Sequence, residues 1–76
     1  MKFKKEDLRN MLNERLVEIT KDKGVDVHLY NGHWTQLGVN DLTGIDASLS
    51  SLITRTGIRI AFNEIDYLEV IEDSGN

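Results

Sequence analysis

Residues 25–39, VDVHLYNGHWTQLGV, decide the fold of this chain. Apolar and polar side chains alternate over residues 25–30, which is the pattern of a half-buried β-strand. Asn31-Gly32 follows, and this pair favours a two-residue type I′ turn, because both central residues of that turn need positive φ. The stretch therefore predicts a β-hairpin that turns at Asn31-Gly32.

The two-residue turn determines which side chains share a face of the hairpin. The inner face then holds Val25, Val27, Leu29 and Trp34. The outer face holds His28, Tyr30, His33 and Thr35. Beyond Gln36 the alternation breaks, which predicts a bulge or bend at Gly38. Trp34 is then a core residue, unless Gly38 shifts the register and leaves it an exposed contact residue; both positions stay open.

The rest of the chain predicts one helix and further short strands within a single domain, residues 1–76. An apolar stripe at helical spacing predicts a helix over about residues 5–21. Its members are Leu8, Met11, Leu12, Leu16 and Ile19. Strands are expected within residues 25–71 and a frayed tail at residues 73–76. The expected fold is mostly β (α+β), an N-terminal helix and then a five-stranded antiparallel small barrel; a helix across an open antiparallel sheet is the alternative.

The order of these motifs resembles the Sm-like and SH3-like small barrels. The helix is followed by V-x-V-x-L, a glycine turn, an Ile45-Asp46 step and a closing stretch, GIRIAFNEI, at residues 57–65. The closing stretch is also similar to the end of the YolD-like proteins of Gram-positive bacteria and their phages. Arg55 and Gly57 precede the closing strands, near where Sm proteins carry an Arg-Gly pair in a uridine pocket. The Sm resemblance implies an oligomeric ring that binds single-stranded RNA, with Arg55 near its pore.

Composition and charge narrow the range of partners. The 76 residues carry a net charge of −4 and no cysteine. Residues 1–23 are about +2, whereas residues 24–76 are about −6. An acidic surface is repelled by duplex DNA and favours a protein partner with a basic surface. A domain of this size buries a small core, so self-association would also stabilise it.

No stretch approaches the roughly 20 apolar residues that cross a bilayer. No membrane association is therefore expected, and a cytoplasmic location is favoured.

The candidate contact surface combines the hairpin tip with an acidic run near the C-terminus. The residues concerned are Tyr30, His33, Trp34, Glu64, Asp66, Glu69 and Glu72. Exposed aromatic residues dominate interface energetics, and carboxylates suit a basic partner. The first hypothesis is a non-catalytic protein-binding module, such as a phage or mobile-element accessory protein that sterically occupies a host protein. Alternatives are the RNA-binding ring and a structural subunit whose helix stripe docks on a neighbour.

No catalytic residues, metal ligands or cofactor are predicted from the sequence. His28 and His33 would lie on one face of the hairpin, but no third ligand stands at a useful spacing. No Ser-His-Asp order, carboxylate pair or phosphate-binding glycine loop is recognisable, so enzyme activity is not expected.

Overall fold

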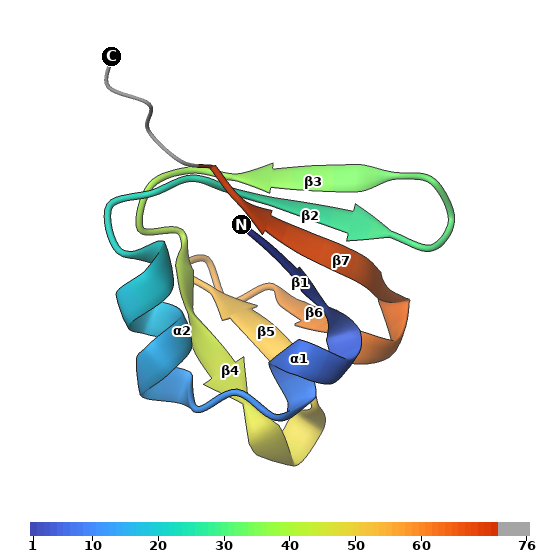
Figure 1. Ribbon diagram of the computed structural model, residues 1–76, viewed down its shortest axis with the longest axis horizontal. Helices are drawn as coiled ribbons and strands as arrows, with labels where there is room; N and C mark the ends of the chain where they lie inside the picture. Colours follow the sequence, from blue (N-terminus) through green and yellow to red (C-terminus); the bar gives the residue numbers. More distant parts are fainter. Residues whose placement is uncertain (72–76) are drawn as a thin grey trace.

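Two antiparallel sheets and two short helices make up the computed structural model, which describes residues 1–71 (Figure 1). The four-stranded sheet has the order β1-β7-β2-β3 and the three-stranded sheet the order β4-β5-β6. The strands are β1 (Lys2–Lys4), β2 (Val25–Leu29), β3 (Trp34–Leu37), β4 (Leu42–Asp46), β5 (Ser51–Thr54), β6 (Arg59–Ala61) and β7 (Ile65–Val70). The helices are α1 (Lys5–Arg9) and α2 (Asn13–Thr20), with short 3₁₀ turns η1 (Ala47–Leu49) and η2 (Phe62–Glu64).

The prediction of a mostly β fold with antiparallel sheets is confirmed, but the prediction of a five-stranded barrel is not. Residues 1–71 form seven strands in two separate sheets. The chain leaves the four-stranded sheet after β3 by a tight turn, in which the Gly38 N–H donates to Asp41 Oδ2 at 2.9 Å. It returns after β6 through η2. The bend predicted at Gly38 thus ends one strand, and β4 begins at Leu42 in the other sheet.

The helix expected over residues 5–21 is divided into α1 and α2. The Asn10 side chain donates to the Glu6 carbonyl at 3.0 Å, and Leu12 adopts an extended backbone. Side chains such as Asn compete with helical hydrogen bonding in this way. At the start of α2, Asn13 Oδ1 accepts from the Ile45 N–H at 2.7 Å, which ties this helix to β4. Of the predicted apolar stripe, Leu12 is therefore 71% exposed.

The strand β1 was not predicted, because it lies outside residues 25–71, where strands were expected. Lys2-Phe3-Lys4 alternates polar and apolar side chains, and Phe3 pairs with Leu68 of β7. Phe3 packs half-buried against the core, and the two lysines are exposed. The strand thereby covers the edge of β7.

The hairpin between β2 and β3 turns through three residues rather than two. The Gly32 N–H donates to the Leu29 carbonyl at 3.1 Å, and the Leu29 N–H donates to the His33 carbonyl at 2.8 Å. Gly32 has φ +88°, so the loop is a β-turn closed by a glycine bulge. The extra residue shifts the register, and Trp34 pairs with His28 instead of Leu29.

This register corrects the predicted faces of the hairpin. Leu37 now pairs with Val25 and lies in the core, so no break in alternation occurs at Gln36. Trp34 lies on the outer face and is 55% exposed, which settles the question left open by the sequence. The buried apolar residues are Leu8, Leu16, Val25, Val27, Leu37, Leu42, Leu52, Phe62, Ile65, Leu68 and Val70. They come from α1, α2 and both sheets, so one core joins all these elements.

None of the helices in residues 1–71 has the length and apolarity to cross a bilayer. The predicted tail at residues 73–76 lies outside the described residues.

Candidate functional site

Two rows of side chains cross the outer face of the four-stranded sheet. Residues on β2 and β7 alternate between the core and this face, because successive side chains of a strand point to opposite sides. The aromatic row runs along Lys4, Tyr67, His28 and Trp34, in the order of the strands. The carboxylate row runs along Lys2, Glu69, Asp26 and Gln36. The sheet therefore gathers aromatic, acidic and basic groups on one surface.

The rings of the aromatic row stack on one another. The His28 and Tyr67 centroids are 4.3 Å apart with an interplanar angle of 13°. The His28 and Trp34 centroids are 5.9 Å apart at 18°. Lys2 Nζ lies 5.0 Å from the Tyr67 centroid, a distance suited to a cation–π contact. His28 thus lies between the Tyr67 and Trp34 rings, Lys2 contacts the Tyr67 ring, and Trp34 on the outer strand β3 is 55% exposed.

Asp26, His28 and Glu69 converge where the two rows meet. One candidate ligand atom from each side chain lies within 4.8 Å of the others. All three residues are half-buried, and Asp26 Oδ1 is buried without a hydrogen-bond partner among the described residues. A nitrogen donor and two carboxylates in one place are a plausible ligand set for a metal ion.

The predicted hairpin-tip residues do not all join this face. The Tyr30 N–H donates to the Glu64 carbonyl at 3.1 Å, and Lys5 Nζ lies 5.0 Å from the Tyr30 ring centroid. Tyr30 and Glu64 line one small hollow of about 170 Å³ at the tip. His33 is exposed in the turn, where its N–H donates to Asn31 Oδ1. Tyr30 and Glu64 therefore form a group apart from Trp34.

The predicted acidic run does not form one surface either. Glu69 lies in the carboxylate row between Lys2 and Asp26. Asp66 is exposed in a bulge of β7, where the register with β2 shifts. Glu72 lies outside the described residues.

Arg55 and Gly57, the residues of the RNA alternative, lie in the loop between β5 and β6. Arg55 Nη2 is 3.1 Å from Asp41 Oδ1, although its side chain is 70% exposed. Gly57 closes the loop with φ +89°. The arginine is thus already paired with a carboxylate.

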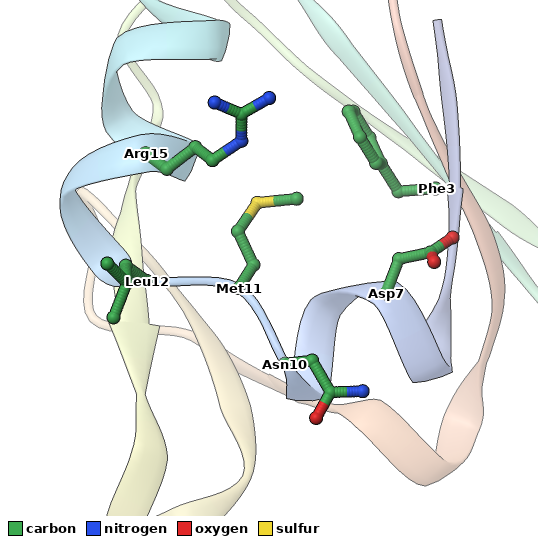
Figure 2. Close-up of a pocket in the computed structure, with 6 residues that line it drawn as sticks. All are labelled: Phe3, Asp7, Asn10, Met11, Leu12 and Arg15. Atoms are coloured by element: carbon green, nitrogen blue, oxygen red, sulfur yellow. The ribbon is translucent and has the colours of Figure 1, made fainter.

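A shallow groove of about 450 Å³ lies between β1 and the two helices (Figure 2). Its lining residues are Phe3, Asp7, Asn10, Met11, Leu12 and Arg15. In Figure 2, Met11 and Arg15 extend into the open space that faces Phe3. The groove mixes apolar and charged groups and contains no histidine or cysteine, so it offers a surface contact rather than a chemical site.

One carboxylate of the three-stranded sheet is strongly hydrogen-bonded. Asp46 Oδ1 accepts from Ser48 Oγ at 2.6 Å and from the Ser48 N–H at 3.1 Å, which caps η1. The Ser48 hydroxyl, the Leu49 N–H and the nearby Arg59 guanidinium lower the pKa of Asp46 below its ordinary value of 3.8. These contacts identify Asp46 as a structural cap.

The convergence at Asp26, His28 and Glu69 and the stacking of Tyr67 were missed from the sequence. The signal present was the i, i+2 spacing in Asp26-x-His28 and Tyr67-x-Glu69, which places each pair on one face of a strand. What the sequence lacked was the pairing of β2 with β7, and therefore the third ligand.

Comparison of the chain with protein-family models, with curated proteins and with solved structures finds no match.

Proposed function

We propose that the protein is a non-catalytic binding module that contacts a protein partner through the outer face of its four-stranded sheet. The observation that carries this proposal is Trp34. It is the only tryptophan of the chain, and more than half of its surface is exposed beside His28 on a regular sheet face. Tryptophan, with tyrosine and arginine, is enriched among the hot spots of protein interfaces.

The stacking geometry favours a protein partner over nucleic acid. Base stacking needs free ring faces, since each base lies flat against an aromatic side chain. Of the three stacked rings only Trp34 is largely exposed, whereas Tyr67 and His28 contact each other, Trp34 and Lys2, so successive bases would find no second free ring on this face. The carboxylates of Asp26 and Glu69 lie next to these rings and repel phosphate. A protein surface that inserts side chains around Trp34 fits this arrangement better.

The charges on the face suggest the character of the partner. Lys2 and Lys4 lie on β1 at one end of the rows, whereas Glu69 and Asp26 lie in the middle. A partner with basic groups opposite the carboxylates and an apolar pocket for Trp34 would be complementary. The module would act sterically, by covering a functional surface, as the accessory-protein hypothesis supposes.

The alternative of an RNA-binding ring is less well supported. That hypothesis needs free strand edges near Ile53 and Ile71 for assembly. Within residues 1–71, β5 lies between β4 and β6, and β7 lies between β1 and β2. Both edges are therefore already paired. Light scattering measures the native mass. A mass of one or two chains would exclude the ring, whereas a mass of five to seven chains would support it.

The experiment that tests the proposal compares Trp34→Ala with Arg59→Ala. Arg59 occupies the position in the β5–β6 hairpin that corresponds to Trp34, so this variant truncates a large side chain at a matched place. Partners captured by the immobilised wild type would be identified and their affinities measured with each variant. We expect Trp34→Ala to weaken binding by roughly 30-fold or more, as for a hot spot, and Arg59→Ala to bind as the wild type does.

Unchanged binding by Trp34→Ala would contradict the proposed contact face. A triple variant, E64Q with D66N and E69Q, tests the acidic contribution separately. If the triple variant binds more weakly and Trp34→Ala binds as the wild type does, the contact involves the acidic residues of η2 and β7 instead of Trp34.

A further inference from the structure

We propose that Asp26, His28 and Glu69 form a binding site for one divalent transition-metal ion, Zn²⁺ in the first place. The site goes beyond the binding function proposed above and is argued separately from it; it uses the carboxylates of Asp26 and Glu69, where a bound ion would take the place of a partner's basic group. It lies on the outer face of the four-stranded sheet, where the carboxylate row meets the aromatic row.

The backbone places the three side chains together. Asp26 and His28 are two residues apart on β2 and therefore leave the sheet on the same side. Glu69 stands opposite Asp26 on the paired strand β7. Their candidate ligand atoms lie within 4.8 Å of one another. Ligands of a tetrahedral Zn²⁺ ion lie about 3.3 Å apart, given bonds of about 2.0–2.1 Å. Binding of the ion would require the side chains, chiefly the longer Glu69, to rotate and close this difference.

Asp26 provides a second, independent sign of a missing ligand. Its Oδ1 atom is buried, yet it accepts no hydrogen bond from the described residues. A buried carboxylate oxygen without a partner is costly, because it has lost its water and gained nothing in return. The register places Lys2 opposite Glu69, but its ammonium lies over the Tyr67 ring. A cation bound between Asp26 and Glu69 would supply the missing partner.

His28 is held in an orientation that suits a metal ligand. An imidazole binds a metal through a nitrogen lone pair that lies in the plane of the ring. Tyr67 stacks on one face of His28 and Trp34 on the other, at interplanar angles of 13° and 18°. The stack fixes the ring plane and leaves its edge, which carries both nitrogens, free of the flanking rings.

The donor set selects the class of ion. Ca²⁺ and Mg²⁺ prefer sites made of oxygen ligands, whereas an imidazole suits Zn²⁺, Co²⁺, Ni²⁺ and Cu²⁺. Two carboxylates and one imidazole satisfy three positions of a tetrahedral ion and leave the fourth for water. Because the site faces solvent, an ion can enter without any opening of the core.

The test is a titration of tag-free, metal-stripped full-length protein with ZnCl₂, followed by calorimetry. We expect saturable binding of one ion per chain and a rise in melting temperature with Zn²⁺. Trp34 lies 5.9 Å from His28, so titration with Co²⁺ should also quench the fluorescence of this single tryptophan.

Variants assign the site to its ligands. Asp26→Asn, His28→Asn and Glu69→Gln should each weaken Zn²⁺ binding by at least about ten-fold. His33→Asn removes the other histidine, which is exposed in the hairpin turn, and should bind as the wild type does. Circular dichroism of each metal-free variant would establish that it is folded before its affinity is compared.

Three outcomes would overturn the site. They are no saturable binding up to about 1 mM Zn²⁺, wild-type affinity in the folded His28→Asn variant, and one ion per two chains. Loss of affinity in His33→Asn instead of His28→Asn would assign the metal to the turn. Partner binding is measured on Trp34→Ala, which keeps all three ligands, so failure of one proposal leaves the other testable.

Discussion

The β2–β3 and β5–β6 hairpins turn through loops of the same geometry. In each, a glycine N–H donates to the carbonyl three residues earlier, from Gly32 to Leu29 and from Gly57 to Thr54. The φ angles of the two glycines are +88° and +89°. The residue before each loop then donates to the carbonyl of the residue after it. The backbone is therefore equivalent in the two hairpins, and what distinguishes them is their side chains.

Equivalent positions next to the loops carry different chemistry. The pair that follows the first loop is Trp34 with His28, stacked in the aromatic row. The matching pair in the second hairpin is Arg59 with Ile53, and Arg59 Nη1 lies 3.2 Å from Asp46 Oδ2. The first hairpin thus exposes an aromatic surface, whereas the second holds its long side chain in an internal ion pair. The same turn is therefore followed by an exposed aromatic side chain in one sheet and by an ion-paired arginine in the other.

The largest expected effect tests the register of the first hairpin. The three-residue loop buries Leu37 opposite Val25, whereas a two-residue turn would point it outward. Leu37→Ala should therefore lower the free energy of unfolding by about 2–5 kcal/mol, as should Leu52→Ala in the second hairpin. Urea denaturation measures both, and Val39→Ala, at a residue that is 54% exposed, is the control. A loss below about 0.5 kcal/mol for Leu37→Ala, the size expected at a surface position, would contradict this register.

The two loops also show why the length of the first turn was predicted incorrectly. In the second loop, Arg55-Thr56-Gly57, the only glycine stands at the end, where φ is positive. Asn31-Gly32 is the usual sequence of a two-residue turn, but the same pair also fits positions two and three of a longer loop. The choice depends on which register buries more apolar surface. Burial of Leu37 favours the longer loop, and this advantage arises only in the folded core.

In the rest of the chain, local sequence patterns predicted where a helix or strands form. Contacts between residues far apart in the sequence determined where these helices and strands begin and end. The apolar stripe predicted one helix over residues 5–21, whereas the structure forms two, α1 and α2, and the hydrogen bond from Ile45 of β4 to Asn13 at the start of α2 has no signal in the sequence. β1 has three residues and acquires its strand conformation by pairing with β7. The candidate metal site likewise combines β2 with β7, so that sequence spacing provides two ligands and not the third.

The second-largest expected effect is the loss of stability on replacing the loop glycines, which tests whether the two loops have equivalent backbones. Gly32→Ala and Gly57→Ala should each cost about 1 kcal/mol, because an L-residue is strained at positive φ. A Cβ atom at either position meets nothing within 4 Å, so the backbone alone sets the cost. Gly24→Ala is the control, since its Cβ would make only ordinary contacts, the nearest at 3.5 Å. Thermal or urea unfolding measures all three, and losses that differ by more than about 1 kcal/mol between the loops would show that they are not equivalent.

The smallest effect is confined to acid pH and concerns the ion pair that distinguishes the second hairpin. The folded pKa of Asp46 lies below its ordinary value of 3.8, chiefly because the Ser48 hydroxyl donates to its carboxylate. Well above pH 3.8 the group is ionised in both states, and its contribution to stability is complete. As the pH falls from there through the folded pKa, the unfolded state takes up the proton first and the contribution is lost.

Asp46→Asn keeps an oxygen for the Ser48 and Leu49 N–H groups but removes the charge opposite Arg59. The stability of this variant should therefore decline less than that of the wild type as the pH falls below about 4. Urea unfolding over a series of pH values measures the difference, and Asp66→Asn, at an exposed position, controls for the change in net charge. Parallel curves for Asp46→Asn and the wild type would show that Asp46 does not stabilise the second hairpin through its charge. The two hairpins would then differ in the chemistry of Trp34 and Arg59, and not in an ion pair that stabilises one of them.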